Sequence, residues 1–204
     1  MGDRVASTAF FLRSAGYCAF IVAAAGFAYS ILFVLQARGA AGLAPWVAAL
    51  LLLGGLLTIP VLLALYETLR DLEPLVALLA IVLGVGGALG AALHGSYDLA
   101  TSLHPVAGAN AQLPNPIDPR GFMTFGVAGL SLLIFARLLH GAPRYQPWLA
   151  WIAALSAVLL IVIYLGRLVI LTATNPLVIG PAALEGLIVN PLFYVLLGLN
   201  LRRI

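Results

Sequence analysis

Long apolar segments alternate with short polar ones along almost the whole chain. Each apolar segment is long enough, at about 20 helical residues, to cross the ~30 Å hydrocarbon core of a bilayer. The six segments cover residues 14–36, 45–66, 74–95, 121–139, 148–172 and 181–201. The pattern predicts an all-α protein, a polytopic transmembrane bundle of six helices that forms one domain over residues 1–204.

Composition supports this class. Apolar residues make up 63% of the chain and charged residues 8%, with a mean hydropathy of +1.12. A soluble domain with this composition would lack the polar side chains needed to cover its surface. The net charge of +3 does not indicate a nucleic-acid partner, because the basic residues are not clustered as such a surface requires.

The arginines predict an orientation in the membrane. Seven of the ten basic residues fall on the side of the bundle that holds both termini: Arg4, Arg13, Arg70, Arg137, Arg144, Arg202 and Arg203. The other three, Arg38, Arg120 and Arg167, fall on the opposite side. Because cytoplasmic loops carry the excess of positive charge, we expect a bacterial inner-membrane protein with both termini in the cytoplasm.

The connection after the third span is the only long one, over residues 96–120, and it is rich in proline. Pro105, Pro114, Pro116 and Pro119 lie within 15 residues of one another, which excludes a regular helix there. This external segment is either a plain loop resting on the bundle or a functional cover that docks a partner.

Two local patterns concern the helices themselves. Gly86 and Gly90 form a GxxxG pair, which predicts close helix packing and a central place for the third span, with a dimer interface as the alternative use. Asn190 and Pro191 lie near the middle of the last span, where proline removes a backbone hydrogen bond and predicts a kink.

A few polar residues are expected together towards the outer face of the bundle. They are His94, Asp98, Arg120, Tyr164, Arg167 and Glu185. Glu185 is expected in the first turns of the sixth span, where a carboxylate needs a partner or a proton. Arg167 on the preceding span is one candidate for an ion pair with it, although snorkelling to the headgroups also explains an arginine at that position.

His94 and Asp98 are four residues apart, so on a continuous helix they share one face, where a carboxylate can orient an imidazole. A metal site would need a third ligand, and only His104 is near; the zinc spacings HExxH and CxxC are absent from the sequence. We therefore expect no metal and no cofactor. Axial ligation of a haem or a chlorophyll-type pigment by His94 alone is the alternative.

The segment His94-Gly95-Ser96-Tyr97-Asp98 resembles a motif of a bacterial family of six-span membrane proteins of about 200 residues and unknown function. Members of that family tend to carry His-Gly-x-x-Tyr-Asp/Asn after the third span. This chain has one spacer residue fewer, and its proline-rich segment 105–119 departs from the family pattern. The resemblance implies six spans and a bacterial inner membrane, and it implies no reaction.

Three functions remain open from the sequence. Spans without a charged residue at the centre favour a non-catalytic structural or accessory subunit of a larger respiratory or photosynthetic membrane complex, bound to other membrane subunits. The alternative is a small-solute transporter or channel with an outward-facing polar site bounded by Asp98, Arg167, Glu185 and Asn190. The second alternative is a membrane-embedded enzyme in which His94 and Asp98 act as a base pair.

Overall fold

The computed structural model describes residues 2–105, 121–170 and 175–203. Within these ranges the chain is helical, contains no strand, and has six helices long and apolar enough to cross a membrane. The predicted all-α, six-span architecture is therefore confirmed.

The first three spans are single helices: α1 (Gly2–Ala37), α2 (Ala44–Leu69) and α3 (Pro74–Leu103). The fourth span starts as a π-helix, η1 (Phe122–Val127), and continues as α5 (Ala128–His140). The fifth span is α6 (Pro147–Val169). The sixth is divided into α7 (Pro176–Leu184), the π-helix η2 (Glu185–Val189) and α8 (Asn190–Arg202).

Two helix ends differ from the prediction. Helix α3 runs to Leu103 rather than to residue 95, because Thr101 and Ser102 donate their hydroxyls to carbonyls one turn back and so remain compatible with a helix. The sixth span begins at Pro176 rather than at residue 181. There the side chain of Asn175 accepts a hydrogen bond from the Leu177 amide at 3.0 Å, so Asn175 caps a helix that begins before the predicted span.

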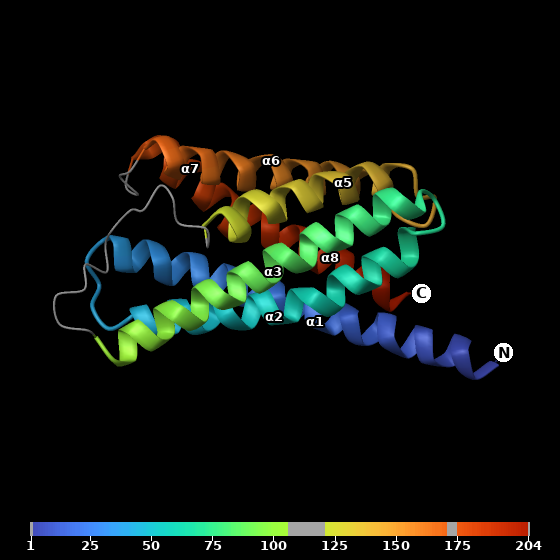
Figure 1. Ribbon diagram of the computed structural model, residues 1–204, viewed down its shortest axis with the longest axis horizontal. Coiled ribbons are helices and arrows are strands. Elements are labelled where there is room, and N and C mark those ends of the chain that lie inside the picture. Colours follow the sequence, from blue (N-terminus) through green and yellow to red (C-terminus); the bar gives the residue numbers. More distant parts are fainter. Residues whose placement is uncertain (1, 106–120, 171–174, 204) are drawn as a thin grey trace.

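The spans form a ring in chain order (Figure 1). Each packs against the next, and the ring closes where α8 packs against α1. Helix α3 lies in this ring between α2 and η1–α5, so it does not occupy the central place expected from its glycines. Both termini lie at one end of the bundle, which we call the terminal end, with residues 70–73 and 141–146 (Figure 1). The opposite end is the far end.

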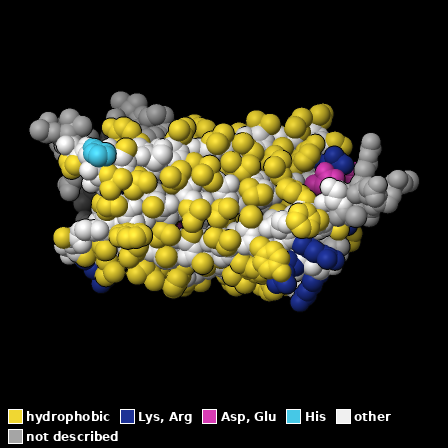
Figure 2. Space-filling model, turned by 90° about the horizontal axis from the view of Figure 1, so that it is seen from below, with side chains coloured by type: hydrophobic (Ala, Val, Ile, Leu, Met, Phe, Trp, Pro, Cys, Tyr) yellow, Lys and Arg dark blue, Asp and Glu magenta, His cyan; other side chains and the backbone are white. Residues whose placement is uncertain are grey.

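The outer surface suits a bilayer. Figure 2 shows one face of the bundle covered with hydrophobic side chains, with charged side chains gathered near the ends. Trp46 is 65% exposed at the start of α2, and Trp148 and Trp151 lie at the start of α6. Tryptophans at span ends are typical of the membrane–water interface. The six apolar helices and this outer surface fit an integral membrane protein.

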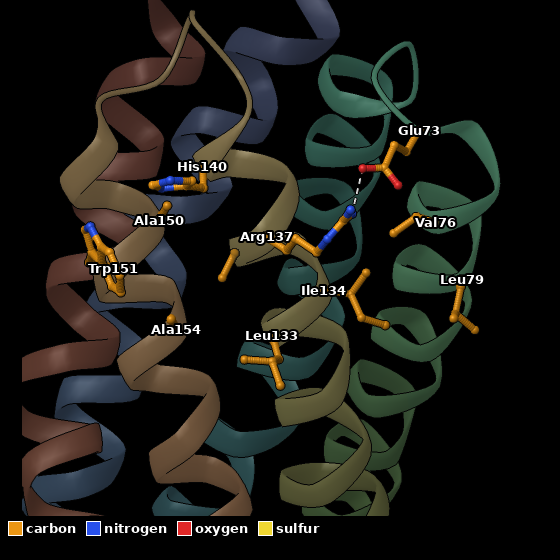
Figure 3. A pocket seen from close by; sticks show the side chains of 11 residues that line it. Glu73, Val76, Leu79, Leu133, Ile134, Arg137, His140, Ala150, Trp151 and Ala154 are labelled. Atoms are coloured by element: carbon orange, nitrogen blue, oxygen red, sulfur yellow. Dashed lines mark hydrogen bonds and ion pairs between the residues drawn. The ribbon is translucent and has the colours of Figure 1, made fainter.

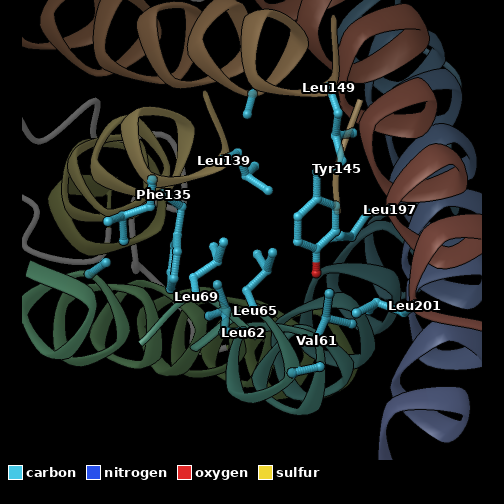
Figure 4. Close-up of a cluster of buried hydrophobic side chains, with 14 of the residues drawn as sticks. Val61, Leu62, Leu65, Leu69, Phe135, Leu139, Tyr145, Leu149, Leu197 and Leu201 are labelled. Carbon is cyan, nitrogen blue, oxygen red and sulfur yellow. The ribbon is translucent and has the colours of Figure 1, made fainter. Parts of the chain in front are cut away.

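Inside the ring, a cluster of large apolar side chains fills the terminal half. Leu65, Leu69, Phe135, Leu139 and Leu197 are each no more than 1% exposed and point into the space between the helices (Figure 4).

Tyr145 reaches into this cluster from the connection between α5 and α6, and its hydroxyl lies 2.8 Å from that of Thr68. Burial raises the pKa of the Tyr145 phenol, against the lowering effects of the Thr68 hydrogen bond and the Arg144 charge.

The GxxxG face of α3 packs within the bundle. A β-carbon added at Gly86 or Gly90 would meet Met123 of η1, and one added at Gly87 would lie 2.8 Å from the Ala128 side chain and 2.9 Å from its backbone. The glycines thus let α3 approach the fourth span at backbone distance.

Candidate functional site

The most unusual residue of the described structure is Glu185, an acidic side chain that is 4% exposed inside the sixth span. It lies nine residues beyond Pro176, the first residue of α7, which corresponds to about 14 Å along a helix axis. The sequence placed Glu185 in the first turns of this span, and that depth is wrong because the helix starts earlier than predicted. Glu185 is a midspan residue.

Glu185 is held by two neutral donors. Ser156 of α6 donates its hydroxyl to Glu185 Oε1 at 2.5 Å, and Asn190 Nδ2 donates to the same oxygen at 3.4 Å. The other oxygen, Oε2, is buried and has no hydrogen-bond partner among the described residues. One carboxyl oxygen is therefore fixed by the protein, and the other is presented without a partner.

The candidate ion pair between Arg167 and Glu185 does not form. Glu185 bonds to Ser156, which precedes Arg167 by eleven positions on α6, or about 16 Å along the helix. Arg167 lies in the last turn of α6, near the far end of the bundle.

The helix around Glu185 is irregular in a way that the sequence only partly indicates. Asn190 and Pro191 lie where a kink is predicted, and the π-helical turn η2 comes directly before them. In that turn the Asn190 amide bonds to the Glu185 carbonyl, five residues back. Isolated π-turns are frequent at functional sites, and with Pro191 they weaken the regular hydrogen-bond ladder at the depth of the carboxyl group.

Helix α1 covers the site on its other side. Ser30 is 8% exposed and donates its hydroxyl to the Gly26 carbonyl at 2.9 Å. Gly186 lies so close to the Ser30 hydroxyl that a β-carbon would collide with it, and a β-carbon on Gly26 would lie 3.2 Å from Asn190 Oδ1. The two glycines let the helices close over Glu185, so the carboxyl group is enclosed by α1, α6 and the sixth span.

A second polar contact lies nearer the far end. His94 Nε2 lies 3.3 Å from Asp98 Oδ2, and His94 Nδ1 lies 3.4 Å from the hydroxyl of Thr124 in η1. The predicted shared face of His94 and Asp98 is thus observed, and His94 links α3 to the fourth span. Both ring nitrogens have side-chain partners in this arrangement, whereas an axial ligand needs one nitrogen turned towards a metal.

Tyr164, another member of the predicted outer cluster, has its ring contact away from Glu185. The Tyr164 ring packs against Phe122 of η1, with 5.3 Å between ring centroids. Arg120 lies outside the described residues, as do Pro114, Pro116 and Pro119 of the proline-rich segment. Two polar sites at different depths therefore replace the single predicted cluster, one at Glu185 and one at His94.

Ser156, Ser30 and Thr124 are the partners that sequence reasoning missed. Ser156 is the only polar residue between Trp151 and Tyr164, and that isolation is the one signal that pointed to it. A lone serine in an apolar run is common, and nothing in the sequence shows which face of α6 carries it. Comparison with protein-family models, with curated proteins and with solved structures gives no match to this chain.

Proposed function

We propose that this integral membrane protein is a small-solute transporter in which Glu185 binds and releases the coupling proton. The observation that carries the proposal is a midspan carboxyl group that is 4% exposed and has one oxygen without a partner. Acidic residues within transmembrane helices are rare and are typical of ion pathways and proton relays.

The contacts of Glu185 support this role on energetic grounds. Burying a carboxylate costs several kcal/mol unless a positive charge or a proton accompanies it. Ser156 and Asn190 supply hydrogen bonds without supplying positive charge. A proton delivered to Oε2 would remove the cost, and its release would restore it, which couples proton movement to a change in the bundle.

The interrupted sixth span supports the same role. Carriers build midplane sites on discontinuous helices, where irregular backbone lines the site. Here η2 begins at Glu185 itself, and Pro191 follows six residues later. We infer that the far end is the side from which Glu185 is reached, because the apolar core fills the terminal half.

The accessory-subunit hypothesis loses its main argument. It rested on spans without a charged group near the centre, and Glu185 is such a group. The enzyme hypothesis requires His94 and Asp98 within reach of each other, and the 3.3 Å distance satisfies that requirement. The bond of His94 to Thr124 nevertheless gives this pair a helix-linking role. We therefore rank transport first.

Orientation and location belong to the same proposal. Six arginines with described side chains lie at the terminal end and support a cytoplasmic position for both termini in a bacterial inner membrane: Arg13, Arg70, Arg137, Arg144, Arg202 and Arg203. The resemblance of the His94–Asp98 segment to the six-span bacterial family supports the same location.

Proton access to Glu185 is tested without knowing the solute. Proteoliposomes adsorbed on a solid-supported electrode receive a pH jump, and proton binding inside the membrane produces a transient charge displacement. We expect this transient in the native protein and its loss in Glu185→Gln. The matched control is Glu67→Gln at the terminal end of α2, where the carboxylate pairs with Arg70 in contact with solvent. This control should retain the transient.

Two outcomes would overturn the proposal. The first is an equal transient in native and Glu185→Gln protein, which would place the titrating group elsewhere. The second is a native protein that gives no transient and that co-purifies in gentle detergent with a stoichiometric membrane partner, which would restore the subunit hypothesis. Circular dichroism and size-exclusion profiles establish that each variant is folded.

A further inference from the structure

A groove of about 740 Å³ crosses α3, α5 and α6 on the outside of the terminal half. Its floor and walls are apolar, with Val76 and Leu79 on α3 and Leu133 and Ile134 on α5 (Figure 3). This volume falls within the range of about 300–1,000 Å³ that is usual for small-molecule sites. The groove is separate from Glu185, which does not line it.

Small side chains create the depth of the groove. Ala150 and Ala154 lie one turn apart on α6, and their small side chains leave space between α5 and α6. Trp151 lies beside them (Figure 3). The His140 and Trp151 rings meet edge to face with 5.9 Å between centroids. Trp151 is the fifth residue of α6, so it places this end of the groove near the membrane–water interface.

The mouth of the groove carries one positive and one negative group side by side. Arg137 Nη1 lies 2.6 Å from Glu73 Oε1, and the two side chains are 64% and 44% exposed. Both groups therefore remain accessible from outside. The guanidinium group has further N–H groups that can donate hydrogen bonds to a phosphate. The second oxygen of the carboxylate can accept hydrogen bonds from an ammonium group.

We propose that this groove binds a phospholipid with a zwitterionic, primary-amine headgroup, such as phosphatidylethanolamine. The phosphate contacts Arg137, the ammonium group contacts Glu73, and an acyl chain lies along Val76, Leu79, Leu133 and Ile134. The positive Arg137 and the negative Glu73 at the mouth thus complement the negative phosphate and the positive ammonium group of that headgroup. A purely anionic lipid would face the Glu73 carboxylate with its own negative charge, and a choline headgroup has no N–H to donate.

The choice of a lipid over a protein partner rests on position and on charge. The groove opens on the outer surface of the spans, which the bilayer covers, and its polar mouth lies at headgroup depth. Figure 3 shows Glu73, Arg137 and His140 towards the helix ends and the apolar residues deeper along them, which is the order of groups in a phospholipid. This inference stands independently of the transport proposal.

Trp151 provides a direct probe of the groove. In a variant with Trp46→Phe and Trp148→Phe, Trp151 is the only tryptophan, since the chain has three. The variant in detergent is titrated with phospholipids brominated on the acyl chain, which quench a nearby indole. We expect the ethanolamine lipid to quench at a mole fraction about tenfold below that of the choline or glycerol lipid, a free-energy difference of about 1.4 kcal/mol.

The headgroup contacts are tested by two substitutions and one control. Arg137→Gln and Glu73→Gln should each remove the preference for the ethanolamine lipid, whereas Arg203→Gln, also at the terminal end, should keep it. Inorganic phosphate should not displace the lipid, because the acyl chain supplies part of the binding.

Equal quenching by the three lipids would overturn the proposal, as would a preference that survives both groove substitutions. Displacement by phosphate alone would reduce the site to an anion site and also overturn it. If the single-tryptophan variant fails to fold, mass spectrometry of lipids retained by the unaltered chain and by Arg137→Gln answers the same question. A protein that co-purifies and protects Trp151 from every brominated lipid would assign the groove to a partner helix instead.

Discussion

The two halves of the bundle are built differently along the membrane normal. The terminal half is filled by large apolar side chains such as Leu65, Phe135 and Leu197. The far half contains the polar contacts of His94 with Thr124, and Glu185 lies at the boundary between the halves. The terminal half is packed mainly with large apolar side chains, among which Tyr145 contacts Thr68, whereas in the far half the polar contact of His94 with Thr124 joins two spans.

Helix regularity follows the same division. The π-helical turn η1 lies at the far end and η2 lies at the boundary between the halves, and each carries a buried polar side chain that contacts another span. The terminal halves of the same spans, α5 and α8, are regular α-helices. Irregular backbone thus coincides with buried polar side chains, and this supports our proposal that the transport site lies at the boundary between the halves and opens towards the far end.

The largest effect is expected from a cavity in the terminal half. Leu197→Ala removes a side chain that is 0% exposed, whereas Leu199→Ala, two residues along α8, removes one that is 39% exposed and faces lipid. We expect Leu197→Ala to lower the free energy of unfolding by about 2–3 kcal/mol. This is the lower part of the usual range, because in a bilayer the loss is one of packing contacts and not of transfer from water.

Thermal or denaturant unfolding in the same detergent checks this pair. Leu199→Ala should change stability by less than about 0.5 kcal/mol, since it exchanges one lipid-facing contact for another. Similar losses for the two variants would mean that the apolar cluster is not a packed core, and the contrast between the halves would fail.

A slightly smaller effect is expected where helices touch through backbone. A β-carbon on Gly55 would lie 2.7 Å from the Ala88 carbonyl and the Ala92 amide, whereas one on the adjacent Gly54 would meet nothing within 4 Å. Gly55→Ala must therefore push α2 and α3 apart, at a cost of about 1–3 kcal/mol. Gly54→Ala should leave stability unchanged or raise it slightly, because alanine favours a helix. Unfolding transitions of the two variants decide the matter, and a neutral Gly55→Ala would contradict the close contact.

The sequence predicts the spans well because hydropathy over about 20 residues reports directly on bilayer thickness. The six spans and the positions of Trp46, Trp148 and Trp151 at span ends all follow from that local property. The helix ends are predicted less well. Asn175 lies outside the predicted spans, yet it caps α7, and this extends the span outward by one turn or more.

The site could be predicted only in part. Glu185 stands out in the sequence as an acid within an apolar segment, but its partner depends on how two helices are rotated about their axes. Spans that are apolar on every side carry no signal for that rotation. The sequence therefore offered Arg167 as the candidate partner and gave no reason to choose Ser156, which only the packing of α6 against the sixth span identifies.

Two buried serines allow the Glu185 site to be compared with an ordinary structural hydrogen bond. Ser156 donates to Glu185 at 2.5 Å, and Ser131 donates to the Ala80 carbonyl at 2.7 Å. Ser156→Ala and Ser131→Ala should each lower the free energy of unfolding by about 1 kcal/mol. Only Ser156→Ala should alter the pH-jump charge displacement, because only it changes the surroundings of the proposed proton site. A change of the transient in Ser131→Ala alone would locate proton binding away from Glu185.

The smallest effect concerns pH and the terminal half. Burial raises the pKa of Tyr145 in the folded protein, so in the unfolded chain the phenol ionises first, near its ordinary value of 10.0. The stability that the neutral phenol contributes is fully present below that pH and is lost as pH rises through the higher pKa of the folded state. Tyr145→Phe cannot ionise and should lack this part of the decline.

At neutral pH the same substitution should cost only about 0.5 kcal/mol, since the Thr68 hydroxyl keeps its own bonds to the Ala64 and Leu65 carbonyls. Unfolding temperatures of native and Tyr145→Phe protein are compared at about pH 8 and about pH 11, on either side of the ordinary tyrosine pKa. The other tyrosines are the same in both proteins, so the difference between the two curves isolates Tyr145. Parallel curves would show that the Tyr145 phenol is hydrated, and the terminal half would then be less tightly closed than its apolar side chains indicate.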